Sequence, residues 1–326
     1  MYIHVMIFSR DRAMQLDATL RSFYLHCRDA HLAQVSVLYL ATTPRSKEQY
    51  SRLQEEHPAM RFIPQADFRK DVLELLNPSP GGTQRHRFGQ IIDLPVMVRF
   101  RERSLLQRAW RRLFNSILFP LLLRLASVPS DDLFIFFMVD DNIFVQDFDL
   151  FPITNSLRQT SDALGFSLRL GRNTTYTYMH NSPQALPEFS VMEQRILRYN
   201  WTKAEHDFNY PLEVSSSIYR ATQIFPLLTV SQFQNPNMLE YALAIQSRRY
   251  AKRFPQLLCF GTSVAFCNPI NIVQNVAYEN RAALTHHYAI EELAERFDQG
   301  QRIDVKSYSG FCPNSCHQEV ELRFTS

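Results

Sequence analysis

The segment LFIFFMVDDNIFVQDFDL, residues 133–150, joins a long apolar run to an abrupt pair of acids. Large apolar residues precede Asp140 and Asp141, Asn142 follows, and the chain then becomes apolar again. A short apolar run of this kind is typical of a buried strand. An ionised carboxylate is costly to bury without a partner, so two adjacent ones at the end of a strand indicate a binding site. A solvated turn or a helix cap is the ordinary alternative, because Asp and Asn favour both.

Composition points to a folded, intracellular type of protein. The chain has 326 residues, of which 45% are hydrophobic and 13% aromatic, which is ample material for a core. A net charge of +3 is too small to predict binding to nucleic acid. Five cysteines are few and odd in number, which fits a reducing compartment better than a disulfide framework. With no leader and no long apolar span visible, we expect a cytoplasmic location.

Strand-like and helix-like segments alternate in the first half of the chain. Strands are expected at residues 2–8, 35–41 and 60–64, and helices at 12–27, 46–56 and 68–76. This alternation predicts a mostly parallel sheet covered by helices. The second half is mixed, with strands expected at 163–171 and 211–221 and helices at 237–254 and 289–300. We therefore predict one α/β domain with a Rossmann-like mixed sheet flanked by helices.

The acid pair is predicted to hold a divalent cation. In open α/β sheets, ligands bind beyond the carboxyl ends of the strands, which is where Asp140 and Asp141 are expected to lie. Mg²⁺ and Mn²⁺ prefer oxygen ligands and commonly bridge carboxylates to substrate phosphates. Asn142 offers a further oxygen, or a group that orients a sugar hydroxyl.

Three segments together resemble a known family. FFMVDDNIF, residues 136–144, looks like the DxD-type motif of GT-A nucleotide-sugar glycosyltransferases, in which acids hold the metal that bridges the donor diphosphate. Residues 3–23 are similar to the first strand, loop and helix of those enzymes. Residues 215–220 and 235–249 resemble the acceptor-side segment of inverting, family-two-like members. The resemblance spans most of the chain. It departs from the pattern where the acidic cluster reads Asp-Asp-Asn and where Tyr241 follows Glu240 in place of a second acid.

The resemblance implies a role for each of a set of residues. The metal is expected to be Mn²⁺ or Mg²⁺, and the donor a UDP-, GDP- or dTDP-sugar. Residues 1–150 would form the half that binds the nucleotide sugar, and residues 151–326 the half that binds the acceptor. The implied nucleotide-binding residues are Ser9, Arg10, Arg12, Thr42, Asp67 and Asp140, the implied metal ligands are Asp141, Asn142 and His317, and the implied catalytic base is Glu240.

Several of these roles have competitors. A helix cap is a slightly better interpretation of Asp67, and His286 and His287 compete with His317 for the metal. Cys312, Cys316 and His317 form one cluster, whereas a structural zinc site needs four ligands, usually in two pairs. At Glu240 the dipole of the expected helix would keep the carboxylate ionised. Arg169, Arg172, Trp201 and Asp207 are further acceptor-side candidates, with a packed aromatic loop as the alternative.

Residues 99–124 form an arginine-rich segment with an apolar stripe. Contact with anionic lipid or a phosphorylated substrate is one interpretation, and would make the protein peripherally membrane-associated. An ordinary surface helix is the better one, because helices that cover a sheet are amphipathic.

The sequence thus predicts a metal-dependent, inverting glycosyltransferase that acts on a saccharide or lipid-linked acceptor. A nucleotidyltransferase or pyrophosphorylase is an alternative, although the loop FSRDRAM lacks the glycines those enzymes usually place there. A non-catalytic module that binds nucleotide sugars is the third hypothesis.

Overall fold

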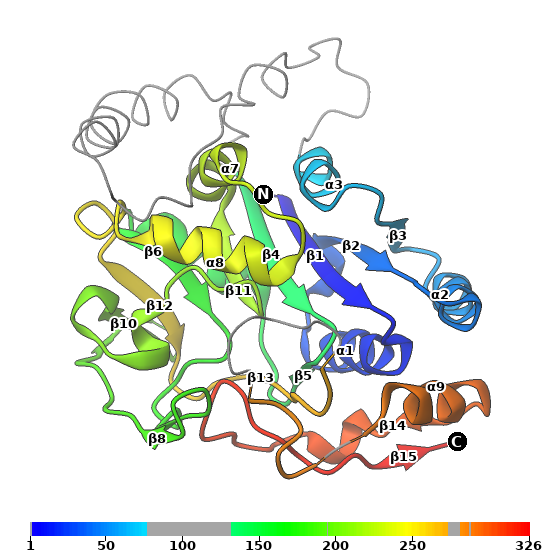
Figure 1. Cartoon of the computed structure of the whole chain (residues 1–326). Coiled ribbons are helices and arrows are strands. Elements are labelled where there is room, and N and C mark those ends of the chain that lie inside the picture. The colour runs from blue at the N-terminus through cyan, green and yellow to red at the C-terminus, as the bar shows by residue number, and fades with distance from the viewer. Residues whose placement is uncertain (1, 77–131, 194, 273–280, 287) are drawn as a thin grey trace, which may run out of the picture.

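A nine-stranded mixed sheet organises the part of the chain that the structure describes (Figure 1). The computed structural model describes residues 2–76, 132–193, 195–272, 281–286 and 288–326. The strand order is β3-β2-β1-β4-β11-β6-β12-β10-β9. The strands are β1 (Tyr2–Arg10), β2 (Ala33–Leu40), β3 (Arg61–Pro64), β4 (Leu133–Val139), β6 (Ala163–Ser167), β9 (Ser190–Val191), β10 (Ile196–Asn200), β11 (Ser217–Arg220) and β12 (Gln256–Phe260).

Strand directions divide this sheet into a parallel part and a mixed part. β1 pairs in parallel with both β2 and β4, and β2 pairs in parallel with β3. β11 is antiparallel to both of its neighbours, β4 and β6, whereas β12 returns parallel to β6. The predicted α/β class with a mixed sheet flanked by helices is therefore confirmed.

Side chains alternate along the central strands and build a core on each face of the sheet. On β1, Ile3, Val5 and Ile7 belong to one core, whereas Met6 and Phe8 belong to the other. The residues of β4 alternate in the same way. Successive side chains of a strand point to opposite faces, so both faces of these strands are buried.

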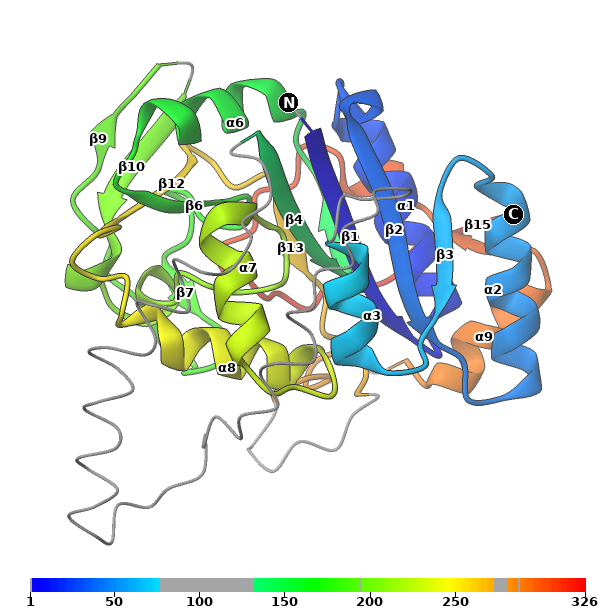
Figure 2. The same cartoon turned by 90° about the horizontal axis from the view of Figure 1, so that it is seen from above.

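Helices cover both faces (Figure 2). Four of them contribute to the core of Ile3, Val5 and Ile7, and three contribute to the core of Met6 and Phe8. The first group is α1 (Ala13–His26), α2 (Pro44–Glu56), α6 (Leu150–Gln159) and α9 (Ile290–Asp298), and the second is α3 (Phe68–Leu75), α7 (Ala221–Val230) and α8 (Pro236–Ser247).

Short elements complete the described part of the chain. β5 (Asn142–Phe144) pairs with β13 (Ala265–Cys267), and so brings the residues after β4 against the second half of the chain. Figure 1 shows the C-terminal segments crossing the lower edge of the sheet, where β1 and β4 end. The remaining elements are β7 (Tyr176–Thr177), β8 (Ser182–Pro183), β14 (Arg302–Ile303), β15 (Phe324–Thr325) and the 3₁₀ helices η1 (Ala30–Leu32), η4 (Trp201–Lys203), η5 (His206–Asn209) and η6 (Val305–Tyr308).

Local chemistry explains where the structure differs from the expected elements. α2 begins two residues early because Thr43 and Ser46 form a capping box and Pro44 occupies the first turn. β11 covers only the end of the expected strand 211–221, and α8 ends at Ser247 within the expected helix 237–254. No described helix is long and apolar enough to cross a membrane. The arginine-rich segment 99–124 lies outside the described residues.

The close packing of β6 against β11 gives a stability prediction. A Cβ atom at Gly165 would lie 2.6 Å from the Tyr219 ring, whereas at Gly261 the nearest atom would be 3.6 Å away. We expect Gly165→Ala to destabilise the fold by about 1–3 kcal/mol through overpacking. Gly261→Ala should stay within about 0.5 kcal/mol of the parent. Urea unfolding of both variants checks this, and equal midpoints would show that β6 and β11 do not meet as described.

Candidate active site

A cavity of about 530 Å³ opens at the carboxyl ends of β1, β2 and β4. Residues from both halves of the chain line it, so the cavity exists only because the second half folds across the end of the parallel strands. The predicted site residues that line it are Ser9, Arg10, Arg12, Asp140, Asp141, Glu240 and His317.

Asp140 joins the end of β4 to the end of β1. One carboxylate oxygen, Oδ2, accepts hydrogen bonds from Ser9 Oγ at 2.9 Å and from the Arg10 backbone N–H at 3.2 Å. The other, Oδ1, pairs with the Arg12 guanidinium at 3.1 Å. The side chain is almost fully buried, and both oxygens have partners. Asp140 therefore holds the loop after β1 in place.

Asp141 is adjacent in sequence but differs in its surroundings. Its Oδ2 lies 3.9 Å from Arg12 NH1, which is too far for a hydrogen bond, and its Oδ1 is buried without a hydrogen-bond partner. The pKa of Asp141 is raised to about 6, chiefly by burial and also by the neighbouring charge of Asp140, against the opposing effects of Arg12 and of the nearby Cys267 and Arg169 side chains. Asp141 is thus the member of the pair with an oxygen available to a ligand.

Asn142 forms the turn instead of facing the cavity. Its Oδ1 accepts a hydrogen bond from the Val139 N–H at 2.9 Å, and its Nδ2 donates to Ser215 O at 3.4 Å and to Cys267 Sγ at 3.2 Å. The residue is fully buried. Because its polar atoms are used within the protein, these contacts argue against the predicted role of Asn142 as a metal ligand. It acts as a positioning residue for the acids before it.

The loop after β1 is held from several sides. Tyr50 on α2 bonds to Ser9 Oγ at 2.5 Å and accepts the Arg12 backbone N–H at 3.2 Å. Asp11 has a φ of 51°, in the left-handed region, and its carboxylate accepts from Thr42 N at 2.7 Å and Thr42 Oγ1 at 2.8 Å. Thr42, two residues after the end of β2, therefore supports this loop and is not among the residues that line the cavity, so no observation supports its predicted nucleotide contact.

Asp67 caps a helix, as the competing interpretation had it. Its carboxylate accepts the Lys70 N–H at 3.0 Å at the start of α3, and the residue is exposed outside the cavity. Gln65, two residues earlier, lines the cavity together with Phe8 and Phe68. Of these two polar residues after β3, Gln65 lines the cavity and Asp67 does not.

Glu240 faces the cavity from the second turn of α8. Its Oε2 accepts the Val214 N–H at 3.0 Å. Burial raises its pKa, and the nearby charge of Glu213 raises it further, whereas the Val214 and Tyr210 hydrogen bonds and Arg169 lower it. The helix dipole was expected to keep the Glu240 carboxylate ionised. That effect is confined to the first turn of a helix, and α8 has no acid in its first turn.

A strained residue shapes the wall beside Glu240. Ser216 has a φ of 92° although it is not glycine, and it is fully buried. Its N–H bonds to Phe137 O at 2.8 Å and its carbonyl accepts the Leu168 N–H at 3.1 Å. Such backbone strain costs about 1–3 kcal/mol and persists only where the surroundings enforce it. The two residues before it, Val214 and Ser215, line the cavity.

His317 lines the cavity but is engaged by a buried arginine. Arg169 pairs with Glu213 at 2.8 Å, and its NH1 lies 3.3 Å from His317 Nε2. A guanidinium only donates, so Nε2 must accept and the ring proton lies on Nδ1. Burial and, to a lesser extent, the charge of Arg169 together lower the pKa of His317 to about 3, so the ring is neutral. The Nε2 lone pair is thereby occupied, which argues against His317 as a metal ligand.

The other acceptor-side candidates have structural roles. Trp201 Nε1 donates to Phe254 O at 2.7 Å, and Asp207 is bonded to Thr177 and Gln184. Arg172 lies over the Phe189 ring, 5.1 Å from its centroid. The backbone N–H of His286 donates to Glu319, and His287 lies outside the described residues. Cys312 is exposed and Cys316 is buried, and neither belongs to a group of metal-ligating side chains among the described residues.

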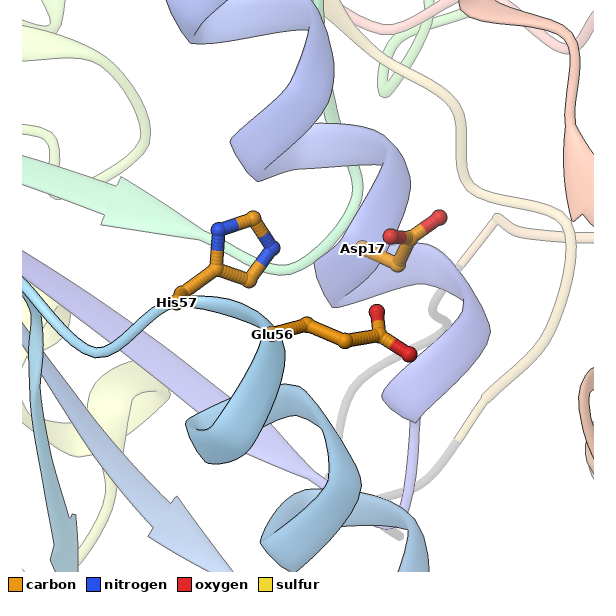
Figure 3. Close-up of side chains that lie close together, drawn as sticks. All are labelled: Asp17, Glu56 and His57. Carbon is orange, nitrogen blue, oxygen red and sulfur yellow. The ribbon is translucent and has the colours of Figure 1, made fainter.

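A separate cluster of possible ligands lies between α1 and the end of α2 (Figure 3). Ligand atoms of Asp17, Glu56 and His57 lie within 4.8 Å of one another, the one such group in the described residues. Arginines already neutralise both acids, since Asp17 pairs with Arg21 at 2.7 Å and Glu56 with Arg302 at 3.0 Å. We interpret this cluster as an ion-pair network between helices.

The cavity residues fit a divalent cation. Asp141 Oδ1 is a buried carboxylate oxygen without a partner, at the cavity wall, and hard cations prefer such ligands. A cation next to it would also offset the cost of ionising a buried acid.

Comparisons with known proteins found similarity to a curated glycosyltransferase and to solved structures. No family model matches the chain. Over 305 residues the chain is 23% identical to the bifunctional glycosyltransferase pgtA of Dictyostelium discoideum, an alignment that covers 85% of this chain and 33% of that protein. The chain thus spans about a third of the length of this curated relative.

Two solved structures show a distant likeness. TarS of S. aureus superposes with a TM-score of 0.43 at 9% identity, covering 82% of this chain and 36% of that one. The mannosyltransferase PcManGT of Pyrobaculum calidifontis, in complex with GDP-Man and Mn²⁺, gives 0.34 at 10% identity, covering 78% and 53%.

The two acids should respond to amidation with opposite signs. The folded state binds the Asp141 proton more tightly than the unfolded chain does, so ionisation above about pH 6 costs stability. We expect Asp141→Asn to stabilise the fold by roughly 1–3 kcal/mol at neutral pH, with the gain shrinking as the pH falls from about 6 to 4. Asp140→Asn should destabilise by about 1–3 kcal/mol at neutral pH, because its oxygens accept three bonds, one from a guanidinium.

Urea unfolding of the two variants at several pH values measures both effects. The same sign for both at neutral pH would contradict the distinction between the paired and the unpaired acid.

Proposed function

We propose that this chain is a metal-dependent glycosyltransferase of the GT-A type that moves a sugar from a nucleotide-sugar donor to a saccharide or lipid-linked acceptor. One observation carries the proposal. A single cavity at the ends of the parallel strands brings together Asp141, Arg12 and, from the other half of the chain, Glu240. The similarity to a curated glycosyltransferase over 85% of the chain supports it.

Residues 1–150 would bind the donor. The apolar side chains of Phe8, Leu38 and Phe68 line the cavity beside Gln65, and this combination suits a flat base that needs hydrogen bonds at its edge. Arg10 and Arg12 line the same cavity, and they would bind the diphosphate. Asp140 serves the donor indirectly, by fixing the loop that carries both arginines.

Asp141 would hold Mn²⁺ or Mg²⁺, which when bound neutralises the charge that develops on the departing diphosphate. The carboxylate must be ionised to bind a cation, so metal binding should weaken below about pH 6, where Asp141 takes up its proton. Arg12, paired with Asp140 and near Asp141, would adjust its contacts when the cation arrives.

Glu240 would act as the base that takes the proton of the acceptor hydroxyl. Its Oε2 is fixed by the Val214 N–H, and its raised pKa makes it a stronger base than an exposed glutamate. One base and direct displacement would invert the anomeric centre. Residues 151–326 contribute this wall and would bind the acceptor.

The setting of the reaction is proposed from sequence alone. The family resemblance implies a cytoplasmic enzyme that builds surface polysaccharide. The basic segment 99–124 is our candidate for contact with an anionic membrane surface that carries a lipid-linked acceptor.

Donor binding should depend on Asp141 and not on Asp67. In calorimetric titrations with UDP-, GDP- and dTDP-sugars, we expect one of them to bind, and only with Mn²⁺ present. Asp141→Ala should weaken this binding about 10-fold or more, because the cation loses its charged ligand. Asp67→Ala should leave donor affinity unchanged while costing about 1 kcal/mol of stability through loss of the α3 cap.

Other outcomes would point elsewhere. Metal-dependent consumption of a nucleoside triphosphate would favour a nucleotidyltransferase, and donor binding without hydrolysis or transfer would favour a binding module. Donor binding that does not respond to metal or to Asp141→Ala would contradict the proposal.

The base role of Glu240 is tested by amidation. We expect Glu240→Gln to lower the rate of transfer by about 10²–10⁴-fold with donor affinity unchanged, because the amide cannot accept the proton. In the parent the rate should rise with pH as Glu240 ionises, and Glu240→Gln should remove this rise. Gln234→Ala, at the same cavity wall, is the matched control. An unchanged rate in Glu240→Gln would exclude Glu240 as the base.

A further inference from the structure

Asn271 carries a second unpartnered oxygen at the cavity. Of the buried side-chain oxygens without a hydrogen-bond partner in the described residues, two belong to residues that line this cavity, Asp141 Oδ1 and Asn271 Oδ1. Asn271 is only 5% exposed, so contact with bulk solvent does not supply the missing hydrogen bond of its Oδ1. A buried polar atom without a partner is rare in folded proteins and calls for an explanation.

The orientation of the Asn271 amide is set by its nitrogen. Nδ2 donates to Tyr288 O at 3.1 Å. The amide group is planar, so this bond determines the direction of Oδ1 as well. The direction of Oδ1 is therefore fixed, and this oxygen is buried without a hydrogen-bond partner.

One arginine places Asn271 beside the acid pair. NH2 of Arg12 donates to the Asn271 backbone carbonyl at 2.5 Å, while NH1 lies 3.1 Å from Asp140 Oδ1 and 3.9 Å from Asp141 Oδ2. Because the nitrogens belong to one guanidinium, the acids and Asn271 are neighbours across a single charged group.

The backbone fixes the same neighbourhood independently. The Asn268 N–H donates to the Asp141 carbonyl at 2.9 Å. The Asn268 side chain is bonded to both backbone groups of Val320, at 3.0 and 3.3 Å. The segment that carries Asn271 is thereby attached to the turn after β4 on one side and to the C-terminal segment on the other.

We propose that Asn271 Oδ1 is a ligand of the divalent cation, together with Asp141. This inference rests on the proposed function, because it concerns the same cation. A carboxylate and a neutral amide oxygen are both ligand types that hard cations accept. The cation would join the turn after β4 to the segment after β13, and so connect the two halves of the chain at the cavity.

Substitution by aspartate separates this role from a structural one. The amide makes its structural bond through Nδ2 and would bind metal through Oδ1. Asn271→Asp removes the donor to Tyr288 O but keeps an oxygen and adds a negative charge. Asn271→Ala removes both groups. A structural role and a ligand role therefore predict different results for the aspartate variant.

The experiment is a titration of the full chain with Mn²⁺, followed by the electron paramagnetic resonance signal of the free ion, with and without UDP, GDP and dTDP. We expect Asn271→Ala to raise the Kd for Mn²⁺ about 10-fold. Asn271→Asp should bind Mn²⁺ at least as tightly as the parent. Gln234→Ala, which removes another amide at the cavity, should leave the Kd unchanged.

Two results would overturn the inference alone. Equal weakening in Asn271→Ala and Asn271→Asp would assign Asn271 a structural role, and unchanged affinity in Asn271→Ala would exclude it as a ligand. In both cases Asp141→Ala would still weaken Mn²⁺ binding, so the proposed metal dependence would stand. If the parent bound no Mn²⁺ with any nucleotide, the inference and the proposed metal dependence would fail together. Asn271→Asp remains decisive where the alanine variant does not fold.

Discussion

The attachment of Asp140 to the end of β1 is the interaction on which the cavity depends. β1 and β4 are neighbouring parallel strands, and register alone would leave the loops beyond them free to diverge. Asp140 prevents this by accepting bonds from Ser9, Arg10 and Arg12. Tyr50 supports the same loop from α2. A rigid loop fixes the arginines before any ligand arrives, and such preorganisation reduces the entropy that binding must overcome.

The two adjacent acids divide two tasks that one acid could not perform. A carboxylate that is fully paired stabilises the fold but has no oxygen to offer. A buried carboxylate with an unpartnered oxygen costs stability, as the raised pKa of Asp141 expresses, but is suited to a cation. Asn142 enforces the division, because its bond to Val139 sets the turn that directs the neighbouring acids differently. The same unpartnered oxygen therefore makes ionised Asp141 costly to the fold and suits it to the proposed binding of a cation.

The sequence was sufficient for features that depend on local pattern. The apolar run of β4, the acids after it and the alternation of strands and helices led to the mixed sheet and to the correct strand ends. It was insufficient where a role depends on contacts between distant segments. His317 is neutral chiefly because it is buried, and its Nε2 is engaged because Arg169, far away in sequence, donates to it. Gln65 and Asp67 are two residues apart, and only the start of α3 decides which one caps a helix and which one faces the cavity.

The second half of the chain converts the end of a sheet into an enclosed site. β11 runs antiparallel between β4 and β6, so the chain must approach it from the cavity side, and the strained Ser216 makes that approach tight. Tyr219 then bonds to the carbonyls of Pro211 and Glu213, which holds the approaching loop over the β4 turn. This loop supplies the N–H that fixes Glu240. The position of the proposed base is thus set by β11, which lies next to the strand that precedes the acids. A change in the packing of these two strands would therefore move residues on both sides of the cavity.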